Sequence, residues 1–100
     1  MFTGIIEEIG TIQEIRSIHE GAVITISAVE IIPELKIGDS VAVNGVCLTA
    51  TSIGSGSFSC DISAETLRMS TFKQARQGVR VNLERSLINQ ITLHLPREEK

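Results

Sequence analysis

The sequence predicts an all-β fold, namely a six-stranded antiparallel Greek-key barrel with one short helix. Turn-forming residues divide the chain at short and fairly regular intervals, which is typical of a small barrel or sandwich. Isoleucine accounts for 15 of the 100 residues, while Tyr and Trp are absent, and β-branched side chains favour strands. Closure removes the exposed edges of so small a sheet, and a chain of this length has room for one domain.

The first strand is predicted in segment 4–16, where the apolar spacing alone is ambiguous. Isoleucines recur at every third position, as they would on one face of a helix, at Ile6, Ile9, Ile12 and Ile15. Gly4, Gly10 and the β-branched residues argue against a helix. A long strand with a bulge near Gly10 accounts for both features.

The next elements are predicted from alternation and from one turn motif. Segment 22–28 indicates a strand, with one face formed by Ala22, Ile24, Ile26 and Ala28. Segment 29–38 reads as a loop with one helical turn. Asn44-Gly45 separates strand 40–43 from strand 46–53, and this residue pair favours a tight hairpin with positive φ at both positions.

A second hairpin and the helix follow. The Gly-Ser-Gly-Ser stretch at 54–57 predicts the turn, and strand 57–62 places Phe58, Cys60 and Ile62 on one face. Ser63 is a suitable N-cap for a helix over 64–70, whose first turn carries a glutamate where negative charge suits the helix dipole.

The last predicted strand, 79–84, follows Gly78. Its apolar face consists of Val79, Val81 and Leu83, and its polar face consists of Arg80, Asn82 and Glu84. Residues 1–87 are therefore predicted as the β-barrel domain. Residues 88–100 differ in composition and are predicted as a divergent C-terminal tail with a solvated, charged end.

Charge and hydropathy exclude two classes of partner. The net charge is −3 and the nine basic residues are dispersed, so the electrostatic footprint of a nucleic-acid binder is missing. Apolar runs are far shorter than the roughly 20 residues of a membrane-spanning helix, and the N-terminus lacks the pattern of a signal peptide. We expect no nucleic-acid partner, no membrane segment and a cytoplasmic location.

The cysteines and histidines give no catalytic or metal-binding motif by spacing. Cys47 and Cys60 lack ligand spacing, and a cytoplasmic chain keeps them as thiols. His19 lies in a predicted turn and His94 in the tail, so neither has a Ser or Cys partner fixed by a motif. The expected metal content is none.

Segment 44–51 is the first candidate site. If Val46, Leu48 and Ala50 face inward, the other face carries Cys47, Thr49 and Thr51. A small thiol and hydroxyls beside a tight turn suit a flat heterocycle with several hydrogen-bonding edges. The alternative is that Cys47 is a small buried hydrophobe and the threonines are simply good strand formers.

Segment 61–68 is the second candidate. It runs from a strand end into a helix start, where free N–H groups can hold a carbonyl or a polyol. The alternative is an ordinary capping segment with a surface pair between Glu65 and Arg68. The residue pattern alone leaves both alternatives open.

Five ordered motifs resemble the amino-terminal half of riboflavin synthase, and together they cover about residues 1–87. They are Met-Phe-Thr-Gly-Ile-Ile-Glu-Glu-Ile-Gly at 1–10, Asn-Gly-Val-Cys-Leu-Thr at 44–49, Phe-Ser-Cys-Asp at 58–61, Glu-Thr-Leu-Arg at 65–68 and Val-Asn-Leu-Glu-Arg at 81–85.

The resemblance implies a reaction and an assembly. Members of the family have two similar six-stranded barrels and a C-terminal helix that drives trimer formation. Two molecules of 6,7-dimethyl-8-ribityllumazine exchange a four-carbon unit, giving riboflavin and 5-amino-6-ribitylamino-uracil, without a metal or organic cofactor. The active site lies between the amino-terminal barrel of one subunit and the carboxy-terminal barrel of another, and each barrel holds one lumazine.

The resemblance also implies site residues. Gly4, Ile5 and Ile6 are expected to contact the ring through backbone groups. Cys47, Leu48 and Thr49 are expected to form the floor and to bind the pyrimidinedione edge, and Cys47 is the candidate catalytic group. The ribityl chain is expected to contact Asp61, Ile62, Ser63, Ala64, Glu65 and Thr66.

The chain departs from the family pattern after Arg85, where a second barrel with a Gly-Gly-His element should begin. His94 does not match that element. We therefore expect a chain that binds lumazine or riboflavin with little turnover and forms a homodimer through the face that normally packs against the sister barrel. The alternative is a non-catalytic flavin or lumazine carrier, such as the related antenna proteins.

Overall fold

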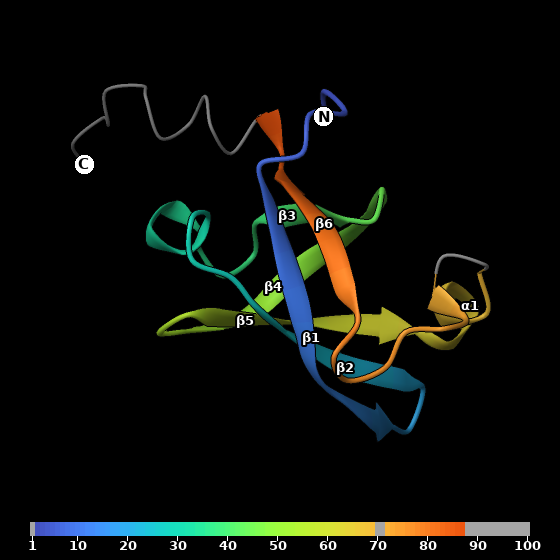
Figure 1. Ribbon diagram of the computed structural model, residues 1–100. Coiled ribbons are helices and arrows are strands. Elements are labelled where there is room, and N and C mark those ends of the chain that lie inside the picture. Colours follow the sequence, from blue (N-terminus) through green and yellow to red (C-terminus); the bar gives the residue numbers. More distant parts are fainter. Residues whose placement is uncertain (1, 70–71, 88–100) are drawn as a thin grey trace, which may run out of the picture.

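Six antiparallel strands close into a barrel in the order β1-β2-β5-β4-β3-β6. The computed structural model describes residues 2–69 and 72–87, and Figure 1 shows the closed sheet with one short helix at its side. The strands are β1 Glu8–Ile18, β2 Gly21–Ser27, β3 Ser40–Val43, β4 Val46–Gly54, β5 Ser57–Ser63 and β6 Arg80–Arg85, with the 3-10 helix η1 Ile32–Glu34 and the helix α1 Ala64–Leu67. The predicted fold class is confirmed.

The barrel interior is filled by one face of each strand. The predicted inward faces of segments 22–28 and 57–62 are buried, and the largest buried side chain is Phe58 at 1% exposure. Burying one large aliphatic or aromatic side chain contributes about 1.5–3 kcal/mol, so these alternating faces supply the main driving force for closure. The fully buried set also includes Ile12, Ile24, Ile26, Ile31, Ile62, Leu83, Val41, Val43 and Cys60.

The β3–β4 hairpin has the predicted tight turn. Asn44 has φ of 49° and Gly45 has φ of 84°, as a type I′ turn requires. The Asn44 N–H donates to the Asn82 carbonyl at 2.8 Å, and the Asn44 Oδ1 accepts from the Asn82 N–H at 2.7 Å. The turn is therefore fixed against β6, which orients the start of β4.

The first strand begins later than predicted, at Glu8 rather than residue 4. Gly4 has φ of 87°, so the extended backbone is interrupted there, and residues 3 and 4 hydrogen-bond to a side chain of β6 instead of a ladder. The bulge also lies elsewhere. The β1–β2 register shifts between Ile12 and Glu14, three residues beyond the predicted position at Gly10.

Gly10 has a different reason to be glycine. A Cβ at this position would lie 2.6 Å from the Ser27 carbonyl oxygen and 2.8 Å from side-chain atoms of Ile26 and Leu83. The residue thus allows β1 to pack closely against β2 and against the core, and the bulge predicted near Gly10 lies three residues further along the strand.

The helix is shorter than predicted. Ser63 is the N-cap, and its Oγ accepts from the Thr66 N–H at 3.2 Å, as expected. The helix ends at Leu67, where the N–H groups of Arg68 and Met69 turn back to Glu65 and Thr66. No helix within residues 2–69 and 72–87 has the length and apolar character of a membrane span. The predicted tail 88–100, with His94, lies outside the described residues.

Candidate functional site

Strands β4 and β5 separate along half of their length. They are paired from Gly54 opposite Ser57 to Ala50 opposite Cys60. Toward Val46, β4 has β3 as its strand partner, and beyond Cys60, β5 has β2. Within the described part of the chain, no strand pairs with the facing edges of 46–49 and 61–63, and Figure 1 shows the two strands running apart from their shared hairpin.

The facing edges of 46–49 and 61–63 border a gap in strand pairing, here called the β4–β5 opening. The hydrogen bonds of Ala50 show in which direction the backbone groups of β4 point along it. Its N–H donates to the Asp39 carbonyl at 2.9 Å and its carbonyl accepts from the Gly38 N–H at 2.8 Å, so both groups of Ala50 face the β3 side. Backbone direction alternates along an antiparallel strand. The backbone groups of Cys47 and Thr49 therefore face the opening.

The same alternation applies to β5. Cys60 lies opposite Ala50, whose backbone groups face β3, so the two residues do not hydrogen-bond to each other and the backbone groups of Cys60 face β2. The backbone groups of Asp61 and Ser63 therefore face the opening. The side chains of Asp61 and Ser63 are exposed, as are those of Cys47 and Thr49. The opening is thus bordered on both sides by small polar side chains and by backbone groups without a strand partner among the described residues.

The predicted site residues of the two strand ends and the helix start differ in exposure. Leu48 is 6% exposed and Ile62 is 2% exposed, and both side chains lie in the core. Ala64 and Glu65 are exposed at the start of α1, and Thr66 is half-buried. The Ala64 N–H donates to the Glu20 carbonyl and the Thr66 N–H to Ser63 Oγ, so two N–H donors of the helix start are already used.

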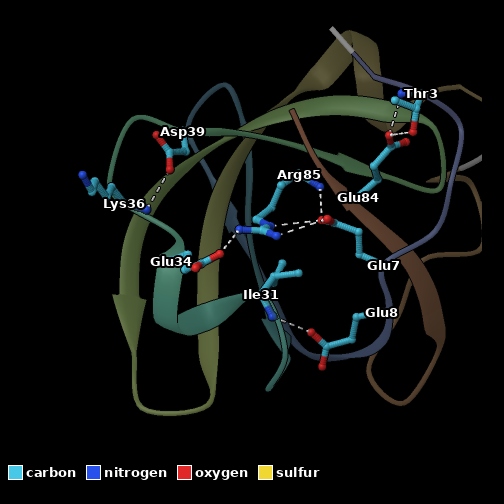
Figure 2. Close-up of polar contacts among 9 residues, drawn as sticks. All are labelled: Thr3, Glu7, Glu8, Ile31, Glu34, Lys36, Asp39, Glu84 and Arg85. Atoms are coloured by element: carbon cyan, nitrogen blue, oxygen red, sulfur yellow. Dashed lines mark hydrogen bonds and ion pairs between the residues drawn. The ribbon is translucent and has the colours of Figure 1, made fainter. Parts of the chain in front are cut away.

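The N-terminal segment, residues 2–7, is held on the barrel by Glu84 (Figure 2). Glu84 Oε2 accepts from the Thr3 N–H at 2.6 Å and from Thr3 Oγ1 at 2.7 Å, and Oε1 accepts from the Gly4 N–H at 3.1 Å. The hydrogen bond from the Thr3 hydroxyl, assisted by the two backbone bonds, lowers the pKa of Glu84. Glu84 stands on the predicted polar face of its strand, yet it is only 4% exposed, because the N-terminal segment covers it.

The other end of the N-terminal segment is held by Arg85. Its guanidinium Nε and Nη2 donate to the two carboxylate oxygens of Glu7 at 3.1 and 3.2 Å, and Nη1 donates to Glu34 at 2.8 Å. The Arg85 backbone N–H also donates to Glu7 at 2.8 Å. The hydrogen bond to Glu7 raises the pKa of Arg85, which therefore stays charged. Figure 2 shows Arg85 between the two glutamates.

Between these two anchors the predicted ring-contacting residues are presented to solvent. Ile5 is 69% exposed and Ile6 is 47% exposed. A half-open cavity of about 180 Å³ adjoins the segment and is lined by Thr3, Ile5, Glu7 and Glu84.

Strand register places the N-terminal segment and the Cys47 motif on the same outer face. Ala42 of β3 lies opposite Cys47 of β4 and opposite Glu84 of β6. Residues directly opposite one another share a face, so Cys47 is two strands from the carboxylate that holds Thr3 and Gly4. The structure therefore brings the N-terminal segment and the two edges of the opening to one side of the barrel.

The two cysteines differ in solvent exposure and in the reactivity of their thiols. Both are free, with Cys47 exposed and Cys60 buried. Burial raises the pKa of the Cys60 thiol to about 12, so it stays protonated and unreactive. Only Cys47 is available to a ligand. Within residues 2–69 and 72–87, no group of three or more His, Cys, Asp or Glu is arranged to hold a metal ion.

Known proteins resemble this chain in sequence and in fold. The family model for the lumazine binding domain matches residues 3–86. The chain belongs to the lumazine-binding domain family. Its relatives include the riboflavin synthase of Actinobacillus pleuropneumoniae, 46% identical over 87 residues, and that of Saccharomyces cerevisiae, 45% identical over 94 residues. Each match covers 87% of this chain and 40% of the relative, so the chain spans about two fifths of their length.

Two solved structures show the same barrel with ligands. One is LumP complexed with riboflavin, with a TM-score of 0.79 and 28% identity over 88% of this chain and 48% of that chain. The other is LumP complexed with 6,7-dimethyl-8-(1'-D-ribityl) lumazine, with a TM-score of 0.78 and 28% identity over 87% of this chain and 49% of that chain. The predicted resemblance to riboflavin synthase and the lumazine-binding barrel are thus confirmed.

Sequence reasoning missed the residues that hold this lumazine-binding domain's N-terminal segment. Glu7, Glu84 and Arg85 lie within the recognised motifs, yet none was assigned a role in positioning. The one available signal was a glutamate and an arginine side by side at the end of a barrel strand. Nothing in the residue pattern indicated that the first residues of the chain fold back onto them.

Proposed function

We propose that this chain binds 6,7-dimethyl-8-ribityllumazine and riboflavin on the outer face that carries the N-terminal segment and the β4–β5 opening. The observation that supports this most strongly is the pair of facing strand edges, whose backbone groups at Cys47, Thr49, Asp61 and Ser63 have no strand partner in the described chain. A pyrimidinedione edge alternates donors and acceptors in the same way as a strand edge, so it can pair with such groups.

The remaining residues have complementary roles in this proposal. Asp61 and Glu65 are exposed carboxylates that can accept hydrogen bonds from ribityl hydroxyls. The hydroxyls of Ser63 and Thr66, 3.0 Å apart, belong to the same segment. Gly4, Ile5 and Ile6 cover the ring with backbone and aliphatic groups. The absence of Tyr and Trp from the sequence fits a pocket that holds a ring without aromatic walls.

We further propose that the domain supplies one of the two ring sites of the riboflavin synthase reaction. One lumazine loses a proton from an acidic methyl group and the second accepts a nucleophile, and a four-carbon unit passes from one ring to the other. Much of the rate enhancement comes from holding the two rings face to face, because orientation replaces a bimolecular encounter. The exposed thiol of Cys47 is the candidate nucleophilic or polar group, and no metal or organic cofactor is required.

One barrel holds one ring, so turnover by this chain alone is expected to be low. Three isoleucines at the start of the chain are exposed: Ile5 and Ile6, which belong to the proposed site, and Ile9, which is 58% exposed. A second copy would cover this surface, as the sister barrel does in the full-length family, and we propose a homodimer on that basis.

A non-catalytic carrier of lumazine or flavin is the second candidate. The same binding face serves that function, and the LumP structures are complexes with these ligands. The greater identity to riboflavin synthases, 46% against 28%, favours the synthase reading. A carrier would keep the bound ligand brightly fluorescent and would give no riboflavin from ribityllumazine.

The experiment that tests the binding site is a riboflavin titration followed by fluorescence quenching. Thr49→Arg places a long side chain in the β4–β5 opening and is expected to weaken binding at least about tenfold by blocking it. Thr11→Arg is the matched control, since Thr11 is an outward strand position opposite Ser27 and Arg80 and outside the proposed site. Equal affinities of the two variants would contradict the location of the site.

A further inference from the structure

The buried carboxylate of Glu84 is used entirely by the N-terminal segment. Its three hydrogen bonds come from Thr3 and Gly4, and at 4% exposure it has little contact with solvent. A carboxylate removed from water at this position is stabilised only if those donors stay in place. Glu84 and the first residues of the chain therefore fix one another.

The effect of Glu84 extends one residue further through a hydroxyl. The Thr3 hydroxyl donates a hydrogen bond to Glu84. The lone pairs of its oxygen therefore remain available to accept hydrogen bonds from other donors. The Ile5 N–H donates to this oxygen at 3.2 Å. The carboxylate therefore orients the Thr3 hydroxyl, and the hydroxyl orients the Ile5 amide.

The segment has little donor capacity left for a ligand. The N–H groups of Thr3, Gly4 and Ile5 are held as described, and the Glu7 N–H donates to the Leu83 carbonyl at 2.8 Å. What the segment offers a ring is consequently the Ile6 N–H, its carbonyl oxygens and its exposed isoleucine side chains. Their positions depend on the anchors at both ends.

We propose that Glu84 is a positioning residue for ligand binding, which holds Gly4, Ile5 and Ile6 in their ring-contacting arrangement through Thr3. The inference rests on the proposed function, because those three residues are its ring contacts. Glu84 itself does not touch the ligand. Glu84 orders the N-terminal segment in the free protein, so ligand binding does not lose further conformational entropy by ordering that segment.

The test is a double-mutant cycle on the riboflavin affinity of the full chain. Glu84→Gln replaces one acceptor oxygen by an amide that cannot accept from Thr3, and Thr3→Val removes the hydroxyl. Each single variant is expected to raise Kd by about tenfold, as expected for losing a charged hydrogen-bond partner. The double variant is expected to bind no worse than the weaker single variant, because both changes break the same relay.

Three controls make the result specific. Thr3→Ser keeps the hydroxyl and is expected to retain wild-type affinity. Glu14→Gln removes an exposed glutamate of β1 and should change nothing. Hydrogen exchange of the Ile5 amide is expected to accelerate in Glu84→Gln and in Thr3→Val without ligand, at a temperature where thermal unfolding shows that all variants are folded.

The outcomes separate this inference from the proposed function. If the wild-type chain does not bind riboflavin, the proposed function fails and the inference fails with it. If the wild-type chain binds and Glu84→Gln binds equally well, only the inference is overturned. Additive losses in the double variant would also overturn it, since they would show that Glu84 and Thr3 act independently.

Discussion

Gly10→Ala tests the packing that closes the barrel at β1. The added methyl carbon would lie 2.6 Å from the Ser27 carbonyl oxygen, a backbone atom of the paired strand, and 2.8 Å from side-chain atoms of Ile26 and Leu83. Both of those side chains are fully buried and cannot rotate away. Relief requires β1 and β2 to move apart, which weakens the pairing of Thr11 with Ser27.

The expected loss of unfolding free energy is large because the added methyl group meets a backbone oxygen, which cannot move without its strand. Overpacking a well-filled core costs about 1–3 kcal/mol, and a backbone contact on this scale places Gly10→Ala at the upper end, about 3 kcal/mol. For a domain of this size such a loss lowers Tm by about 15 °C. Thermal and urea unfolding followed by circular dichroism measure both quantities.

Gly54→Ala is the matched control for this change. Its Cβ would meet nothing closer than Ser57 Oγ at 3.5 Å, an ordinary contact, and its φ lies outside the left-handed region. The expected effect is within about 1 kcal/mol, with stabilisation favoured because alanine restricts the unfolded chain. If Gly10→Ala were as stable as Gly54→Ala, the reasoning from close packing would be refuted.

Three further predictions concern charge and reactivity. The pKa of Glu84 is lower in the folded than in the unfolded chain, so its carboxylate stabilises the fold at pH values above the unfolded pKa. This stabilisation is lost as pH falls through the folded pKa. In an acid denaturation series, the difference in unfolding free energy between wild type and Glu84→Gln should therefore shrink as pH falls. Arg85→Met should cost about 2 kcal/mol in urea unfolding, between the values for buried and surface pairs, because it removes both guanidinium hydrogen bonds from the partly buried Glu7. An unchanged midpoint would contradict this. A thiol reagent should label Cys47 alone in the native protein, with riboflavin slowing the reaction, and labelling of Cys60 before unfolding would contradict its burial.

The strands were predictable because their signals are local. Alternation over 22–28 and 57–62 fixes which side chains face the core, and Asn44-Gly45 specifies its own turn geometry. Each of these signals depends on neighbours in sequence and on the pleat of a strand. The barrel follows once those faces have to be buried together.

The misplaced features depend on contacts between distant parts of the chain. Gly10 is required by the Ser27 backbone and Leu83, which no local pattern reveals. Glu84 occupies an alternation position typical of an exposed residue, and it is buried only because Thr3, 81 positions away in sequence, folds over it. The alternation of apolar and polar residues along a strand does not reveal that a distant segment lies over one of its outward-facing side chains.

The candidate site was predictable as a set of residue types but not as a geometry. The outward face of 46–51 was inferred from alternation, and its role came from the motif resemblance. The separation of β4 from β5 beyond Ala50 and Cys60 is a property of the closed sheet. It arises because β4 turns to pair with β3 while β5 continues along β2, and strand-by-strand reading does not reveal it.

The most direct test of the account is a riboflavin titration of the wild-type chain combined with a mass measurement in solution. We predict saturable binding with one ligand per chain and a mass of two chains. Addition of 6,7-dimethyl-8-ribityllumazine to the same sample should give bound ligand and little riboflavin. A flat titration, with no change in fluorescence at any protein concentration, would contradict the central claim that this barrel is a lumazine and flavin site.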